Sequence, residues 1–258
     1  MKSSNLILNG NGQNAHSNGH SLYGKSVNGN CQCEHPNDEK HDEAENDLIG
    51  DNHIFTSLNT PLRADAFEMD DTEKIAKIEE HFKVIMETLG LDLTDDSLKG
   101  TPRRVAKMYV KEIFSGLNPA NKPAYTLFDN KYQYNEMLIE RDITFHSNCE
   151  HHFVPIIGKA HIAYIPGEKV VGLSKLNRIV QYFAKRPQVQ ERLTMQIANE
   201  LREVLQTEDV AVLLEADHAC VITRGVGDVN SSTVTSKFYG KFEEEATRRE
   251  FLQLIRKV

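Results

Sequence analysis

The sequence has few cysteines, no long apolar run and no excess of basic residues, and each shortage excludes a class of protein. Four cysteines in 258 residues are too few for a disulfide scaffold, and they leave thiols available for a metal or for catalysis. The apolar stretch from Leu6 to Leu8 is too short for a signal peptide, and no later segment could span a bilayer. We therefore expect a cytoplasmic protein with no membrane partner.

The charge balance argues against nucleic acid as a partner. The chain has 30 basic and 38 acidic residues and a formal net charge of -8, and its Lys and Arg residues form no stripe that would neutralise phosphates. A convincing glycine-rich nucleotide fingerprint is also lacking. Small anionic substrates remain compatible with the sequence, because a few local cations are enough to bind them.

Composition predicts a boundary near residue 64. Residues 1–64 are rich in Asn, Gly, Ser, His, Asp and Glu, and such a segment cannot bury enough apolar surface to offset the entropy of ordering. We expect a disordered tail there, and its Cys31 to His35 cluster is better explained as incidental than as a metal site. The folded domain should span 65–258, with a helical hairpin at 65–120 and a core at 121–258.

Within this domain, helical spacing gives way to strand-like alternation and then returns. Apolar residues at helical spacing predict helices at about 71–90, 101–116, 174–184, 187–205 and from 243 onward. Strands are predicted at about 136–145, 160–165, 210–215, 220–223 and 232–238. This order indicates an α+β fold in which helices cover one face of an antiparallel sheet.

The segment Cys149-Glu150-His151-His152 offers a thiol and an imidazole three residues apart, and both can reach one cation from a turn. With Cys220 as a third ligand, the donors form a Cys₂His set with one open position, which is typical of catalytic zinc. Zinc lowers the pKa of water at such a position toward neutrality. Taken alone, Cys-x-x-His fits a buried thiol beside a solvated imidazole equally well.

Two further histidines favour a catalytic interpretation. His151 adjoins the predicted ligand His152, and His218 lies two residues before Cys220, on the same side of a predicted strand. Imidazole is the natural general acid or base near neutral pH. Both side chains are therefore candidates for moving protons at the metal.

A second group of residues suggests phosphate binding. Lys175 and Arg178 lie at i and i+3 in the first turn of a predicted helix that Ser174 could cap, where free backbone N–H groups favour anions. Arg104 and Arg224 could complete a triphosphate site. Taken singly, each of these cations is better explained as a solvated surface charge.

Four motifs together resemble the GTP cyclohydrolase I family. They are Cys149-Glu-His-His-Phe, Gly172-Leu-Ser-Lys-Leu-Asn-Arg178, Arg186-Pro-Gln-Val-Gln-Glu-Arg192 and His218-Ala-Cys220. The resemblance runs from about Asp71 to the C-terminus and leaves the tail outside. It implies the tunnelling fold (T-fold), in which subunits join their sheets around a barrel and form a homodecamer with active sites between subunits.

The resemblance also implies a role for each motif residue. It makes Cys149, His152 and Cys220 the zinc ligands, His151 and His218 the proton-transfer pair, Glu191, Gln190 and the backbone near Val189 the guanine contacts, Lys175, Arg178, Arg224 and Arg104 the triphosphate contacts, and Ser174 the ribose contact. A carboxylate suits guanine because it can accept from N1–H and the 2-amino group together, which adenine cannot offer. Without the resemblance, Glu191 would be interpreted as an exposed helix carboxylate.

The implied activity is zinc-dependent hydrolysis of GTP. The purine ring opens at C8, formate leaves, and an Amadori-type rearrangement of the ribose carbons gives 7,8-dihydroneopterin triphosphate. The sequence does not distinguish folate from tetrahydrobiopterin synthesis as the pathway, and it does not show whether a regulatory protein acts. The polar tail is a candidate regulatory arm, and a deletion of 1–64 that changed neither activity, assembly nor effector response would argue against it.

Two alternatives stay open at this point. One is another enzyme of the same architecture, such as a pterin synthase or a nitrile reductase acting on a deazaguanine, because fold does not fix function. The histidines around the predicted metal argue against the reductase, which would need a nucleophilic cysteine and a nicotinamide. The other alternative is a zinc-stabilised module that holds a purine nucleotide without turning it over.

Overall fold

The computed structural model describes residues 57–256, so the predictions for the tail up to 56, including the Cys31 to His35 cluster, lie outside the described residues. The helices are α2 (Asp71–Thr88), α3 (Thr101–Met108), α4 (Leu173–Ala184), α5 (Gln190–Leu205), α6 (Ala219–Ile222) and α7 (Glu245–Ile255), with short π or 3₁₀ turns η1 (Tyr109–Ile113), η2 (Ser115–Leu117), η3 (Pro119–Asn121) and η4 (Gly240–Glu243). The strands are β1 (Leu127–Asp129), β2 (Leu138–Cys149), β3 (Pro155–Tyr164), β4 (Lys169–Val171), β5 (Pro187–Gln188), β6 (Val210–His218) and β7 (Thr233–Phe238).

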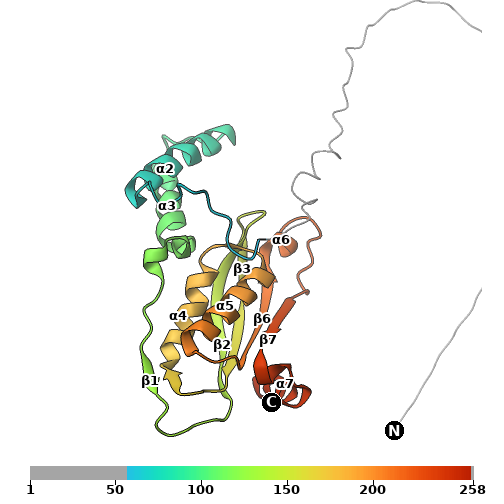
Figure 1. Cartoon of the computed structure of the whole chain (residues 1–258). Coiled ribbons are helices and arrows are strands. Elements are labelled where there is room, and N and C mark those ends of the chain that lie inside the picture. Colours follow the sequence, from blue (N-terminus) through green and yellow to red (C-terminus); the bar gives the residue numbers. More distant parts are fainter. Residues whose placement is uncertain (1–56, 257–258) are drawn as a thin grey trace, which may run out of the picture. The chain divides into compact units, whose positions relative to one another are not determined.

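The main sheet has five strands in the order β5-β2-β3-β6-β7, and Figure 1 labels β2, β3, β6 and β7 among them. Strand β3 pairs antiparallel with both β2 and β6, so β2 and β6 run in the same direction and end at the same edge. Gly158 allows β3 and β6 to approach closely, because a Cβ atom there would lie 2.3 Å from the Glu215 carbonyl oxygen. The predicted α+β class is confirmed, and the antiparallel sheet extends over β2, β3, β6 and β7.

Helices α4 and α5 cover one face of this sheet (Figure 1). Their buried side chains recur at helical spacing, as in Leu176, Ile179 and Val180 of α4, each 0% exposed. Alternate residues of β3 point to opposite faces, so Ile162 joins this core while Ala163 belongs to a second cluster with Phe251 of α7. The helical layer thus places the first turns of α4 and α5 over the sheet.

Helix α2 begins with a capping box. The Asp70 side chain accepts from the backbone N–H groups of Thr72 and Glu73, and the Glu73 side chain accepts from the Asp70 backbone N–H. Helix α2 lies beside α3, and Arg103 of α3 forms an ion pair with Glu79 of α2 at 2.8 Å. Several apolar side chains of α2 face outward, including Ile85 at 50% exposed.

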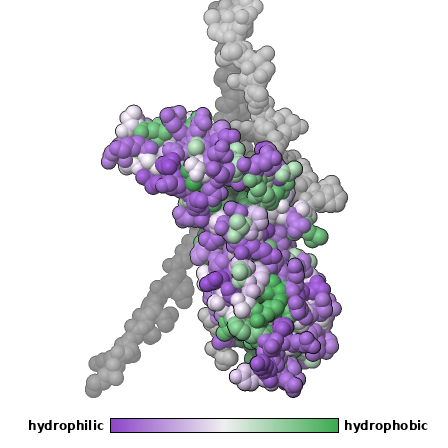
Figure 2. Space-filling model, turned by 60° about the vertical axis from the view of Figure 1, so that its left-hand side comes forward, coloured by the Kyte–Doolittle hydropathy of each residue, from purple (hydrophilic) through white to green (hydrophobic). Residues whose placement is uncertain are grey.

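The face of the molecule in Figure 2 is mostly hydrophilic, with apolar groups gathered in separate areas.

Two local predictions were wrong. The expected strand at 220–223 is the short helix α6, so His218 and Cys220 do not share one side of a strand. A run of three apolar residues does not distinguish a strand from a helical turn, and the chain turns where β6 ends. Ser174 does not cap α4, because Gly172 is the N-cap and Ser174 is already the second helical residue. In residues 57–256 no helix is both long and apolar enough to cross a membrane.

Candidate metal centre and active site

Cys149, His152 and Cys220 converge at one edge of the sheet. Their potential ligand atoms all lie within 4.8 Å of one another. Cys149 is the last residue of β2, and Cys220 lies in α6, directly after β6. Because β2 and β6 end at the same edge, the topology brings together two cysteines that are 71 positions apart in the chain.

The loop after β2 is tightly closed and presents His152 to the two thiols. The Cys149 N–H donates to the Val154 carbonyl and the Phe153 N–H donates to the Cys149 carbonyl, each at 2.9 Å. Phe153 adopts a φ of +56°, which is uncommon for a residue with a side chain. Its ring packs edge-on against Phe114 with the centroids 5.1 Å apart. These contacts fix the backbone on both sides of His152.

The donor group fits a zinc ion. Thiolate and imidazole are the ligands that zinc prefers, and a tetrahedral ion holds such atoms roughly 3.5 to 3.8 Å apart. The Sγ atom of Cys149 lies 3.8 Å from Nδ1 of His152. Burial and the neighbouring Cys149 thiol raise the pKa of Cys220, so bringing the two sulfurs together disfavours thiolate until a cation offsets the charge. Three protein ligands would leave one position open.

His151 also lies close to the Cys149 thiol. Its Nδ1 atom is 3.7 Å from the Cys149 sulfur and its Nε2 atom is 3.9 Å from a carboxylate oxygen of Glu150. Glu150 in turn forms a bidentate ion pair with Arg192, whose side chain is 3% exposed. No role was predicted for Glu150 or Arg192 from the sequence, although both residues belong to its motifs.

His218 ends β6 and hydrogen-bonds through Nε2 to Oε1 of Gln190 at 2.7 Å. Burial lowers the pKa of His218, and the carboxylates of Glu191 and Asp217 partly oppose this shift. The ring is therefore biased toward its neutral form near pH 7. A neutral imidazole can take up a proton, as a general base must.

The three predicted guanine contacts lie at the start of α5, with Val189 as its N-cap. Strand β5 pairs with the end of β2, so that Gln188 lies opposite Cys149 and α5 begins beside the metal ligands. Glu191 is exposed and acts electrostatically on His218. Gln190 differs, because it is 2% exposed and its amide is engaged inside the protein.

The predicted phosphate contacts are distributed over several elements. Arg224 contacts one of the candidate metal ligands, with its guanidinium 2.6 Å from Nε2 of His152. Lys175 donates to the Ala124 carbonyl at 2.9 Å, and Arg178 and Ser174 are exposed on α4. Arg104, on α3, donates to the Ser97 carbonyl at 3.0 Å. Among the described residues, Arg224 is the member of this set with a contact to the candidate zinc ligands.

Two thiols and an imidazole that converge, with two further histidines beside them, have the arrangement of a catalytic metal site. Fold and site thus define an α+β enzyme whose candidate metal lies at the edge of the sheet. The sequence model for GTP cyclohydrolase I matches residues 78–256. The chain belongs to the GTP cyclohydrolase I family, and the resemblance found in its motifs is confirmed.

Curated relatives agree with the family model. A protein named GTP cyclohydrolase 1 from Flavobacterium johnsoniae is 60% identical over 210 residues, covering 81% of this chain and 94% of that protein. Proteins of the same name from Aeromonas hydrophila and Citrobacter koseri are 57% and 52% identical and cover 76% and 81% of this chain, and 89% and 95% of their own lengths. A solved structure of the archaeosine synthase QueF-Like in the apo form aligns with a TM-score of 0.31 and 16% identity over 40% of this chain and 93% of that one, which is too distant to support an argument.

Proposed function

We propose that the protein hydrolyses GTP to formate and 7,8-dihydroneopterin triphosphate, the first step of folate or tetrahydrobiopterin synthesis. One water adds at C8 and opens the five-membered ring as the C8–N9 bond breaks, and a second water hydrolyses the resulting formamide at the C8–N7 bond, so that C8 leaves as formate. The ribose carbons rearrange, and the freed amine closes the pterin ring with loss of one water. The observation that carries the proposal is the convergence of Cys149, His152 and Cys220 in a chain of this family.

The three converging residues would hold zinc, which when bound supplies a Lewis acid and lowers the pKa of water. His218 and His151 would move protons between water and the purine nitrogens, and each adjoins a candidate ligand on a different element. Glu150 would orient His151, because its carboxylate lies near Nε2 and is itself fixed by Arg192. Two histidines at the site can serve successive proton transfers.

Glu191 would recognise guanine, because it is exposed at the first turn of α5 and lies close enough to His218 to affect its charge. The backbone at Val189 would complete the contact to the guanine edge. Arg224, Lys175 and Arg178 would bind the triphosphate, and Ser174 the ribose. Arg224 would then have to exchange its contact with His152 for phosphate oxygens when GTP binds.

We also propose the T-fold homodecamer with active sites between subunits. Arg104 supports this arrangement, because in its own chain it is turned toward Ser97 and Thr101 rather than toward the candidate metal ligands. A neighbouring copy could place it against the triphosphate. The exposed apolar side chains of α2, such as Ile85, would be covered in such an assembly.

The test is to incubate the zinc-loaded protein with GTP and to measure formate together with the ultraviolet absorbance of a pterin. We expect both products to appear in equal amounts and to be lost when a chelator removes the metal. Release of phosphate without formate would contradict the proposal. Stoichiometric zinc and GTP binding without turnover would instead favour a nucleotide-binding module.

A further inference from the structure

The side chain of Gln190 is enclosed where α5 begins, and each of its polar atoms has a defined partner. Its NH₂ group, which has two protons, faces three acceptors: the carbonyl oxygens of Thr233 and Leu214 at 2.9 and 3.3 Å and the Thr235 hydroxyl at 3.1 Å. Its Oε1 atom lies 2.7 Å from Nε2 of His218. Gln190 thus connects α5 with β6, β7 and a histidine of the candidate active site.

These partners determine which way the amide faces. The carbonyl oxygens of Thr233 and Leu214 can accept hydrogen bonds but cannot donate, so the NH₂ group must point toward them. A flipped amide would bring its oxygen against two carbonyl oxygens in a buried place. Oε1 therefore faces His218.

The neighbouring hydroxyls support the same orientation. The Thr194 hydroxyl donates its proton to the backbone carbonyl oxygen of Gln190 at 2.9 Å. It can therefore only accept from the Thr235 hydroxyl, which lies 2.7 Å away. Thr235 has then used its one proton and can only accept from Gln190. The hydrogen bonds from the Gln190 amide to Thr235, from Thr235 to Thr194 and from Thr194 to the Gln190 backbone carbonyl therefore each have one permitted direction.

We propose that Gln190 is a positioning residue that fixes His218 as the Nε2–H tautomer. An amide oxygen cannot donate, so the His218 nitrogen that faces it must carry the proton. Nδ1 is then the ring nitrogen with a free lone pair, and it is the atom through which His218 accepts a proton. This inference rests on the proposed function for its catalytic consequence, while the tautomer itself follows from the hydrogen bonds.

This role differs from the guanine contact that the family resemblance implies for Gln190. A side chain that contacts guanine contributes mainly to substrate binding, so its loss raises KM for GTP. A side chain that selects a tautomer changes the fraction of enzyme with a competent base, so its loss lowers kcat. The two roles therefore predict changes in different kinetic constants, KM for a guanine contact and kcat for a positioning residue.

The direct test is solid-state ¹⁵N NMR of zinc-loaded protein labelled at histidine, at about pH 8 so that imidazoles are neutral. The His218 signals are identified by their absence in the variant His218→Gln. We expect the protonated-nitrogen signal at Nε2 and the unprotonated signal at Nδ1. The reverse assignment in the wild-type protein would overturn the inference, and this measurement needs neither turnover nor a Gln190 variant.

The kinetic test is Gln190→Met, which keeps the length of the side chain and removes its hydrogen bonds. We expect kcat to fall on the order of 10²-fold, as for loss of a general base, while KM for GTP stays within about threefold. A raised KM with unchanged kcat would mean that Gln190 contacts guanine and would refute the positioning role. Unchanged zinc content and circular dichroism are required of the variant.

Thr235→Val is the matched control. It removes one acceptor of the Gln190 amide but leaves both carbonyls, so the His218 tautomer and kcat should stay as in the wild type. A shifted tautomer in this variant would show that the carbonyls do not fix the amide. If the wild-type protein releases no formate from GTP, the proposed function fails, whereas the NMR assignment still decides the tautomer.

Discussion

Single residues at the metal centre divide into those that would hold the ion and those that would act beside it. Cys220 belongs to the first kind, and His151 has the geometry of the second, with Nδ1 3.7 Å from the Cys149 sulfur. Cys220→Ala should lose the metal, because two remaining ligands bind zinc weakly. Zinc content measured by atomic absorption after desalting should fall from one equivalent toward zero.

His151→Ala is the comparison for that variant. It should keep its zinc and lose turnover by about 10²- to 10⁴-fold, the range for removal of a general acid or base. One equivalent of tightly bound zinc in Cys220→Ala would contradict the ligand assignment. Loss of zinc in His151→Ala would move this histidine into the ligand set.

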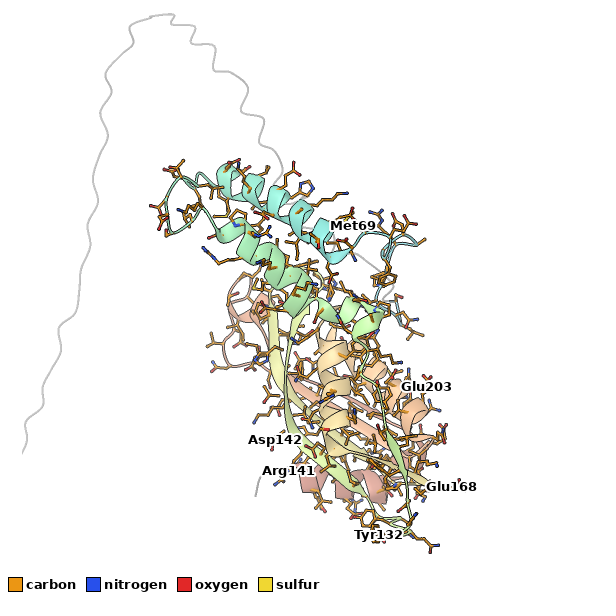
Figure 3. All side chains as sticks on the ribbon, turned by 90° about the vertical axis from the view of Figure 1, so that its left-hand side faces the viewer. Met69, Tyr132, Arg141, Asp142, Glu168 and Glu203 are labelled. Carbon is orange, nitrogen blue, oxygen red and sulfur yellow. The ribbon has the colours of Figure 1, made fainter. Side chains whose placement is uncertain are left out.

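His161, away from the metal, predicts a pH dependence of stability. It is 6% exposed, and its Nδ1 atom accepts the Asp142 N–H at 3.3 Å; Figure 3 shows Asp142 on β2. Burial lowers the pKa of His161, with Asp142 and Glu215 opposing this shift and Lys159 and Arg141 adding to it. The unfolded chain then binds the proton more readily, so stability is full above about pH 6.5 and falls as the pH drops through that value.

Urea unfolding at several pH values between about 5 and 8 measures this contribution. It should amount to at most about 1.4 kcal/mol per pH unit for a single group. The variant His161→Gln keeps a hydrogen-bonding side chain without a titratable ring, and its stability should fall less steeply on acidification. Identical pH slopes for the two proteins would exclude His161 as the cause.

Residue roles were predictable where a motif carries its own chemistry. Cys149, His152 and Cys220 could be proposed as ligands because thiol and imidazole suit a metal wherever they converge, and the structure brings them together. Gln190 and Arg192 could not be assigned in this way. Their roles depend on partners from β6, β7 and the loop after β2. Such partners are brought together by tertiary packing and cannot be identified from residues adjacent in the sequence.

Between elements, the ion pair of Arg192 and Glu150 joins α5 to the loop after β2. Arg192 is 3% exposed at its side chain and Glu150 20%. Glu150→Leu would leave a buried guanidinium without its carboxylate, and this should lower the free energy of unfolding by about 3 to 5 kcal/mol. Chemical denaturation in the presence of a chelator measures the change without a contribution from metal.

A double variant tests whether the loss comes from the unpaired charge. Glu150→Leu combined with Arg192→Leu should recover much of the lost stability, because neither charge then remains buried. Glu208→Gln serves as the matched control, since the Arg202–Glu208 pair is 31% and 71% exposed and such pairs contribute about 1 kcal/mol or less. Equal losses for Glu150→Leu and Glu208→Gln would contradict the structural role.

Long elements were predicted better than short ones. Periodicity located α2, α4, α5 and α7 and strands β2, β3, β6 and β7, because each buries a regular stripe or face. The two-residue strand β5 was not predicted, since its pairing depends on the end of β2. Residues 220–223, most of which lie in α6, were mistaken for a strand because so short an apolar run has no period of its own.

In the molecule as a whole, the segment that precedes α2 is attached to α5. Arg192 Nε donates to the Ser57 carbonyl at 2.7 Å and Gln196 donates to the Leu58 carbonyl at 3.4 Å. A chain lacking 1–64 should therefore be less stable than one lacking 1–56, by about 1 to 3 kcal/mol for the unsatisfied buried donors. Thermal unfolding of the two truncated proteins measures the difference, and equal melting temperatures would show that this attachment does not matter.

The shared edge at which β2 and β6 end has a consequence for folding. An ion held by Cys149 and Cys220 would close a loop between two residues that are 71 positions apart in the chain, much as a disulfide does. In the chain-entropy description a closure of this length is worth about 4 kcal/mol. The metal would then be a cross-link between the ends of two strands in addition to its part in the chemistry. A cell short of zinc would therefore contain less folded protein, and not only less active enzyme.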